Sequence, residues 1–436
     1  MVNESYVNLN DHNHSVCHGN KNVANFLFKS TLLFLLIYNS QVVESVPSLT
    51  SARLSFLVAI LYVAFTNMGY LSIVENSTQK EIRRLWVINF ILFAYALILL
   101  CIQGFGDGET IIAGQLNLLL IDIPAIFVFQ FLFNDSGELA KSVVFVSIVQ
   151  CILVLSSTIF PSIADVLDST IYNRSAYWDT SFLRASGYAV GLGCYTSTGA
   201  LQLGLGMIFC VYFISKKQSS MFYMLVLCFI GIVSTMVART SLVILLFCFL
   251  FLIFSNSKRN KFLKTFFSLS IAVLFFCIFF WAVDSVISEE FLNEYFSRVV
   301  YLKKVGLWRG FFKNYFVSET THVPMVSVSS FLGTGIVSGY SATGEYINVD
   351  GGYRRNIFAL GVLGGSVLYL GFLVTMWKTA SQRLSASVRK VLFLFIFVFF
   401  LVGEFKEPFV FTGYYMVFFF LFASLSEKEE KENLIF

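Results

Sequence analysis

The chain has little charge and almost no proline. Of its 436 residues only 13% are charged and 5 are proline, whereas 57% are hydrophobic and 51 are phenylalanine. A soluble domain of this size carries roughly twice that charged fraction, so the composition excludes an ordinary soluble globular protein. Because few prolines are present to interrupt them, long helices are possible. The composition therefore predicts a helical protein embedded in a membrane.

Several other features are also missing. The net charge is only +4, and no basic arm with interleaved aromatic residues is present, so no nucleic-acid partner is expected. Most of the 8 cysteines lie inside apolar runs, which predicts small core residues rather than a disulfide framework or a zinc site. The polar N-terminus has no small-residue cleavage site, so a cleaved signal peptide is not expected. Neither a cofactor nor a metal ion is expected.

What the chain does contain is a series of apolar runs, most of them close to the twenty or so residues needed to cross a bilayer. They predict an all-α, polytopic membrane protein that forms a single integral membrane domain over residues 1–436. About twelve spans are expected: residues 23–43, 53–73, 85–103, 111–133, 142–162, 188–215, 221–237, 241–254, 265–286, 356–377, 391–402 and 408–424.

The basic residues of the short loops predict the orientation. Every second loop is basic, and cytoplasmic loops carry the excess of Lys and Arg. Both termini are therefore expected in the cytoplasm. The loop residues that support this orientation are Lys80, Arg83, Arg84, Lys141, Lys216, Lys217, Lys258, Arg259, Lys261, Lys264, Lys378, Arg383, Arg389 and Lys390.

Two longer connections, residues 163–187 and 289–355, fall on the outer face in this topology. Loops of this length in a compact helical bundle are usually functional. Their basic residues also oppose the positive-inside bias, so topology does not account for them. A membrane protein rarely keeps ionisable groups beside a helix mouth unless an anionic or reacting ligand binds there. We therefore expect the functional site at the outer face.

Arginines are the first candidates at this face, because a guanidinium can bind a phosphate group through two hydrogen bonds. For Arg239, in a very short turn, the alternative is a side chain that extends to the lipid head groups. For Arg298 and Arg309 the alternative is an interfacial helix on anionic lipid. The candidates are Arg184, Arg239, Arg298, Arg309, Arg354 and Arg355.

The end of the larger loop contains further candidates. Gly333-Thr334-Gly335 lacks the Lys-Ser/Thr of a nucleotide-binding loop, and instead predicts a tight turn or a close approach of the backbone to a ligand. His322, Glu345 and Asp350 are candidates for a general base. A lone histidine of this kind is, however, more often structural.

In this order the features resemble the Wzy-type O-antigen polymerases, which are relatives of the O-antigen ligases. The resemblance covers the whole chain in layout, but the motifs themselves are short. The matching features are the loop with Arg184, the turn with Arg239, and a larger loop that ends in residues 331–336, an acidic-Gly-Tyr motif and residues 359–365. The regular Arg-spacer-Gly repeats of some members are not present in both loops. Asp350-Gly351-Gly352-Tyr353 stands where ligases carry a His-Asn pair, which favours a polymerase.

The resemblance implies a GT-C-like glycosyltransferase of the bacterial inner membrane, with its active site on the periplasmic side. Such an enzyme moves a growing glycan from undecaprenyl pyrophosphate to a sugar hydroxyl of the next lipid-linked repeat unit. The arginines and Tyr353 would bind the pyrophosphate and substrate, in place of a metal ion. Asp350, Glu345 or His322 would deprotonate the acceptor. A chain-length regulator and a flippase are the protein partners implied.

Two alternatives remain open at this stage. One is an O-antigen ligase, which transfers the glycan to the lipid A core. The other is a lipid-linked oligosaccharide flippase, a transporter, for which repeated halves and ionisable residues near the middle of the membrane are typical. The sequence shows no repeat, and its charges gather at one outer mouth, so an enzyme is favoured.

Overall fold

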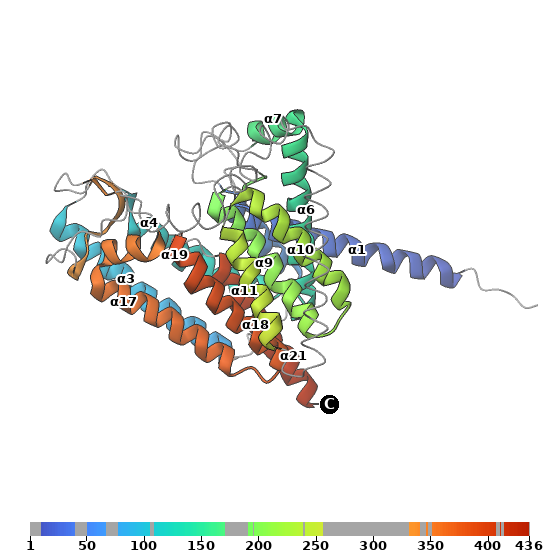
Figure 1. The fold of residues 1–436 in the computed structure, drawn as a ribbon. Coiled ribbons are helices and arrows are strands. Elements are labelled where there is room, and N and C mark those ends of the chain that lie inside the picture. Colours follow the sequence, from blue (N-terminus) through green and yellow to red (C-terminus); the bar gives the residue numbers. More distant parts are fainter. Residues whose placement is uncertain are drawn as a thin grey trace, which may run out of the picture.

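The computed structural model describes residues 10–39, 50–66, 77–104, 109–170, 191–194, 196–238, 240–255, 331–340, 346–347, 351–406, 410 and 414–435. These residues are mostly helical (Figure 1). The helices are α1 (Asn10–Ile37), α2 (Ser51–Thr66), α3 (Ser77–Gln103), α4 (Ile111–Asn117), η1 (Leu118–Asp122), α5 (Ile123–Phe129), α6 (Ser136–Ile159), α7 (Pro161–Thr170), α9 (Thr196–Ser215), α10 (Ser220–Val237), α11 (Thr240–Ser255), α17 (Gly352–Ser381), α18 (Ala386–Phe397), η4 (Val398–Gly403), α19 (Glu404–Lys406) and α21 (Tyr414–Ile435).

Within this part of the chain, 7 helices are long and apolar enough to cross a membrane: Ser77–Ile102, Ile111–Phe129, Ser136–Ile159, Ser197–Ser215, Ser220–Val237, Gly352–Ser381 and Ala386–Gly403. Val23–Ile37, Ser51–Thr66 and Thr240–Ile253 are shorter apolar helices. The prediction of a helical membrane protein is thus confirmed in outline, while the count of about twelve spans stays a prediction. The expected span 265–286 lies outside the described residues.

Large apolar side chains on the surface of these helices are consistent with a lipid-facing exterior. On α3, for example, Phe90, Ile91 and Ile98 are each at least half exposed. A soluble protein rarely exposes a continuous apolar surface of this kind. The exposed faces are therefore explained by contact with lipid chains rather than with water.

Helix α9 forms the centre of the bundle. Every described side chain from Leu201 to Phe213 is buried, and the helix packs against α6, α10, α11 and α18. Its glycines allow this: a Cβ atom at Gly204 would lie 2.6 Å from the Tyr415 hydroxyl. Small residues on membrane helices let neighbouring backbones approach closely. The glycine-rich sequence of α9 is thus accounted for by helix packing.

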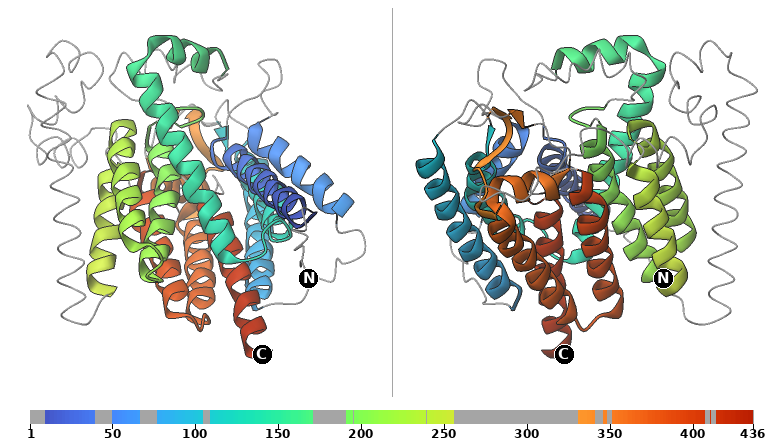
Figure 2. Two further views of the ribbon diagram at one scale, coloured as in Figure 1. Left: turned by 90° about the vertical axis from the view of Figure 1, so that its right-hand side faces the viewer. Right: turned by 60° about the vertical axis from the view of Figure 1, so that its left-hand side comes forward.

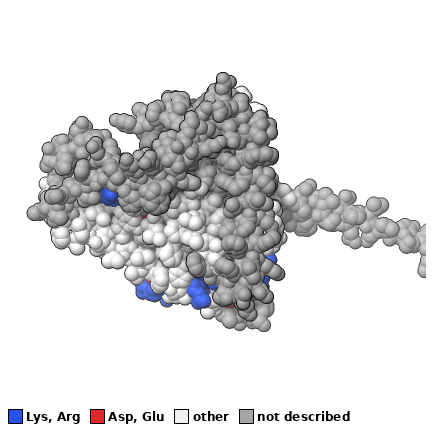
Figure 3. All heavy atoms as spheres, viewed as in Figure 1, with Lys and Arg blue, Asp and Glu red and all other residues white. Residues whose placement is uncertain are grey.

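One end of the bundle gathers the basic loop residues. Lys378 at the end of α17 binds Glu81 of α3 at 2.7 Å, and Ser385 before α18 donates to Glu430 of α21 at 2.7 Å. The start of α6 joins the end of α9 through Ser136 and Tyr212. We call this the basic end, and Figure 3 shows part of its Lys and Arg along the lower edge of the molecule. The basic loop residues that the structure describes therefore share one end of the bundle, and Lys258, Arg259, Lys261 and Lys264 lie outside the described residues.

A small antiparallel sheet, which the sequence did not predict, lies toward the opposite end (Figures 1 and 2). Its strands are β1 (Glu109–Thr110), β2 (Ile336–Tyr340) and β3 (Tyr346–Ile347), in the order β1-β2-β3. Glu109 pairs with Ser338, and Gly339 pairs with Ile347. The sheet joins the segment before α4 to the segment before α17, which are far apart in sequence.

Candidate functional site

Most of the site residues predicted from the sequence lie outside the described residues: Arg184, Arg239, Arg298, Arg309, His322, Glu345 and Asp350. Tyr353, Arg354 and Arg355 are described, and they occupy the first turn of α17. This turn lies away from the basic end, because the last turn of α17 belongs to that end. The candidate site is therefore built from the start of α17 and its neighbours.

Helix α17 consists of two parts that meet at Gly361. The backbone there has φ 70° and ψ 174°, which breaks the helix into a first part (residues 352–360) and a second part (residues 362–381). The first part lies close across the second, since Asn356 donates to the Tyr369 hydroxyl at 2.8 Å. Only glycine adopts this conformation readily. The break thus sets the direction in which the first part, with its two arginines, is held.

The Gly333-Thr334-Gly335 segment explains why the helix breaks at this point. Its glycines have φ values of 94° and 74°. The backbone N–H groups of Thr334 and Gly335 donate to the carbonyls of Phe358 and Ala359 at 3.1 and 2.8 Å, which are groups that a helix end leaves unsatisfied. The segment therefore approaches the backbone of α17 closely, whereas the expected approach to a ligand stays a prediction. No ligand is needed to explain the two glycines.

A buried polar network lies beneath the first part of α17. One carboxylate oxygen of Glu404, Oε1, accepts from Asn356 Nδ2 at 2.9 Å and from the Tyr369 hydroxyl at 2.5 Å. The other oxygen accepts from the backbone N–H of Val410 at 3.0 Å. Glu404 and Asn356 are fully buried, and Asn356 Oδ1 has no hydrogen-bond partner among the described residues. Hydrogen bonds of this kind offset the large cost of burying a carboxylate.

Tyr353, in the first turn of α17, packs against this network. Its hydroxyl donates to the Phe400 carbonyl at 2.7 Å, and its ring lies 4.7 Å from the ring of Tyr369. Phe400 belongs to η4, a π-helical segment, and such segments leave backbone carbonyls available and are frequent at functional sites. The Tyr353 hydroxyl is therefore engaged with the protein. Its predicted role in binding substrate stays a prediction.

Arg354 and Arg355 are half-buried. They follow the N-cap residue Gly351, where a Cβ atom would lie 2.6 Å from the Phe405 carbonyl oxygen. The first turn of a helix presents unpaired N–H groups and a positive dipole end, both of which favour an anion. Two guanidinium groups beside this turn form an arrangement that can bind a phosphate-containing ligand.

Sequence reasoning missed Glu404 and Asn356. Glu404 follows an apolar run as part of a short charged stretch before Pro408, which was the available signal. From the sequence alone, Asn356 is only the first residue of a predicted span. Their roles depend on contacts between residues 48 positions apart, which no local pattern reveals.

A second group of charges, also missed, lies inside the membrane-spanning region. Arg53 of α2 donates to Asn117 Oδ1 at 2.8 Å. Its positive charge also interacts with the Asp122 carboxyl group. Asp122 is in the π-helical segment η1, near the middle of the span Ile111–Phe129. Trp86 donates to the Leu119 carbonyl of the same segment at 3.3 Å. Ionisable residues inside a span are rare and usually functional.

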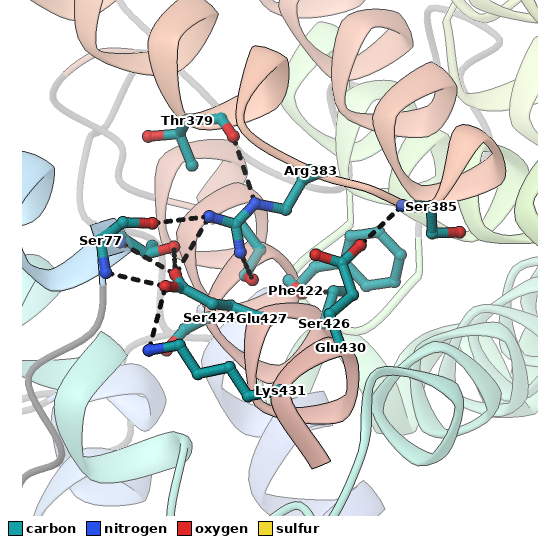
Figure 4. Close-up of polar contacts among 12 residues, drawn as sticks. Ser77, Thr379, Arg383, Ser385, Phe422, Ser424, Ser426, Glu427, Glu430 and Lys431 are labelled. Carbon is teal, nitrogen blue, oxygen red and sulfur yellow. Dashed lines mark hydrogen bonds and ion pairs between the residues drawn. The ribbon is translucent and has the colours of Figure 1, made fainter. Parts of the chain in front are cut away.

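The basic end holds the third polar cluster (Figure 4). Glu427 of α21 binds Arg383 at 3.0 Å and accepts from the backbone N–H groups of Ser77 and Thr78 at 2.8 and 3.0 Å. These N–H groups begin α3, where an acidic group also complements the helix dipole. Arg383 is only 2% exposed and further donates to the Ala423 carbonyl. The cluster ties α3, α17 and α21 together and is structural.

Among the described residues, no group of three or more His, Cys, Asp or Glu side chains could hold a metal ion. The fold and these clusters define a helical membrane protein with a broken helix at one end and a basic surface at the other. Family models, curated proteins and solved structures were all compared with the chain, and no match was found.

Proposed function

We propose that this protein is an O-antigen polymerase of the Wzy type, a metal-independent glycosyltransferase of the bacterial inner membrane. It transfers a growing glycan from undecaprenyl pyrophosphate to a sugar hydroxyl of the next lipid-linked repeat unit, at the periplasmic face. The proposal rests on the resemblance in layout and on the chemistry of the outer-face residues.

The observation that carries the proposal is the placement of Arg354 and Arg355. They lie on the first turn of α17, which Gly361 and the 333–335 segment hold in a bent arrangement at a distance from the basic end. Charge builds up on a pyrophosphate leaving group, and preorganised cations stabilise it most effectively. Arginines fixed at a helix start meet this requirement without a metal ion.

The remaining roles follow from the resemblance. Arg184, Arg239, Arg298 and Arg309 would contribute further cations from other loops, so that the pyrophosphate is bound from more than one side. Asp350, Glu345 or His322 would take the proton of the acceptor hydroxyl. The bilayer supplies both lipid-linked substrates, and a chain-length regulator and a flippase would act beside the enzyme.

The proposal is tested by deleting the gene and examining the lipopolysaccharide. We expect core lipopolysaccharide capped with a single repeat unit, because a separate ligase still transfers an unpolymerised unit. Bare core would instead indicate a ligase or a flippase. An unchanged ladder of repeat units would contradict all three functions. Reintroducing the intact gene controls for effects on neighbouring genes.

One observation favours the flippase as a second candidate. Arg53 and Asp122 are ionisable residues in membrane-inserted helices, and such residues near the middle of a span are typical of transporters. If the deletion strain shows bare core, the position of the accumulated lipid-linked unit decides between the alternatives. Accumulation in the inner leaflet indicates a flippase, and accumulation in the outer leaflet indicates a ligase.

A further inference from the structure

We propose that Glu404 is a positioning residue that fixes the first part of α17, and with it Arg354 and Arg355, against the second part. The significance of this for catalysis rests on the proposed function, whereas the positioning itself does not. Glu404 is not among the residues that sequence reasoning assigned to the site.

The hydrogen bonds of Glu404 connect three segments, and they add to the direct hydrogen bond from Asn356 to the Tyr369 hydroxyl. Asn356 belongs to the first part of α17, Tyr369 to the second part, and Val410 to the segment beyond α19. All three groups donate to one carboxylate, at 2.9, 2.5 and 3.0 Å. Because a carboxylate only accepts hydrogen bonds, it can bind these converging donors at once. The two parts of α17 are thereby joined across the break at Gly361.

The position of the break makes such a device necessary. At Gly361 the helix hydrogen-bond ladder is interrupted, so the first part is not held in direction by the second part through the backbone. The 333–335 segment caps the carbonyls at one end of the first part. Glu404 binds the first part near its middle, at Asn356, which follows Arg355 in the sequence. Two supports at different points along a short helix fix its direction.

Replacement of Glu404 by glutamine tests the role most directly. Glutamine keeps the size but carries an amide N–H₂ group, which would face either the Val410 N–H or the Asn356 and Tyr369 donors. A buried donor opposite another donor loses the hydrogen bond and leaves both groups unsatisfied. We therefore expect Glu404→Gln to loosen the first part of α17. Tyr369→Phe removes the donor to Glu404 and the acceptor of the Asn356 hydrogen bond, so it should act in the same direction.

The control is Glu427→Gln. Glu427 is also a buried glutamate, 6% exposed, with hydrogen bonds and an ion pair, but it lies at the basic end. This variant should lower thermal stability without changing the arrangement of α17. A general loss of stability can thus be separated from a loss of positioning.

The experiment measures the distance distribution between spin labels at Arg354→Cys and Val374→Cys, one in each part of α17, by pulsed electron paramagnetic resonance. Val374 is 61% exposed and can therefore carry a label. Cys17, Cys101 and Cys277 are replaced by serine so that they are not labelled as well. We expect a narrow distribution in the parent and after Glu427→Gln. Glu404→Gln and Tyr369→Phe should each broaden it. If both variants keep the parent distribution, the proposal is wrong; if Glu404→Gln does not fold, Tyr369→Phe decides.

Binding of undecaprenyl pyrophosphate to the purified, unlabelled protein separates this proposal from the proposed function. We expect Glu404→Gln to weaken binding about tenfold, and Glu427→Gln to leave the Kd unchanged. Unaltered binding after Glu404→Gln would contradict the link between positioning and pyrophosphate. A parent protein that does not bind the lipid would contradict the proposed function alone, and the distance distributions would still decide the role of Glu404.

Discussion

At the scale of single residues, Glu427 shows how a buried charge is kept in this protein. Burial on its own raises the pKa of a carboxyl group. Hydrogen bonds from Thr78 and from the Ser77 backbone, together with the Arg383 guanidinium, outweigh burial and lower the pKa of Glu427 to about 2. Truncating one member of such a buried cluster leaves the others without compensation. Glu427 is therefore stabilising only while it is ionised.

This predicts a pH dependence of stability. Because the pKa of Glu427 is lower in the folded chain than its ordinary value of 4.5, the stabilisation is fully present above that value. It is lost as the pH falls toward about 2, and its size is on the order of 3 kcal/mol. Thermal unfolding in detergent should show the parent losing stability across this range. Glu427→Gln should start less stable at neutral pH and change less; identical pH profiles for the two proteins would contradict the prediction.

At the scale of elements, the break in α17 is set by close backbone packing. A Cβ atom at Gly361 would collide with the backbone of Phe331, Leu332 and Gly333. These atoms cannot move aside as a flexible side-chain end can. The left-handed conformation of Gly361 adds strain for any other residue, of about 1–3 kcal/mol. The direction of the first part of α17 therefore depends on one glycine.

We expect Gly361→Ala to lower the apparent Tm by about 5 °C or more, because backbone strain and steric overlap act together. Gly371→Ala, in the same helix, is the matched control: its Cβ would meet only the side-chain carbons of Ile88, at 3.2 Å. That variant should lie close to the parent protein. Similar Tm values for the two variants, measured by thermal unfolding in detergent, would show that the break is not a packing requirement.

The sequence predicts some of these elements and not others. Long apolar runs are a local property, so the span of α10 could be predicted closely, whereas α3 and α6 begin at Ser77 and Ser136, before the predicted spans. Span 356–377 was predicted as one helix, since glycines in membrane helices usually reflect packing. Its break at Gly361 depends on contacts with residues 331–333, which lie some thirty positions upstream. The pairing of Glu404 with Asn356 was unpredictable for the same reason, because both residues act through partners distant in sequence.

At the scale of the whole molecule, charge is distributed between two ends. Contacts between α3, α6, α9, α17, α18 and α21 bring their charged termini together at the basic end, and this agrees with the alternation of basic loops in the sequence. The first turn of α17, with Arg354 and Arg355, lies toward the other end. A basic surface on one side follows from the positive-inside rule, whereas arginines on the other side require a separate reason. Ligand binding supplies that reason in the proposed function.

The two ends should therefore face opposite sides of the membrane, with the basic end in the cytoplasm. Fusions of alkaline phosphatase, which is active only outside the cytoplasm, should be active after Gly187 and Glu319 and inactive after Lys217 and Leu384. Fluorescent-protein fusions at the same four positions should give the opposite pattern and control for expression. If all four alkaline phosphatase fusions were active, or all four inactive, the two ends of the bundle would not face opposite sides of the membrane. A reversed pattern would keep that arrangement but place Arg354 and Arg355 in the cytoplasm, where lipid-linked repeat units are assembled rather than polymerised, and the proposed function would then be wrong.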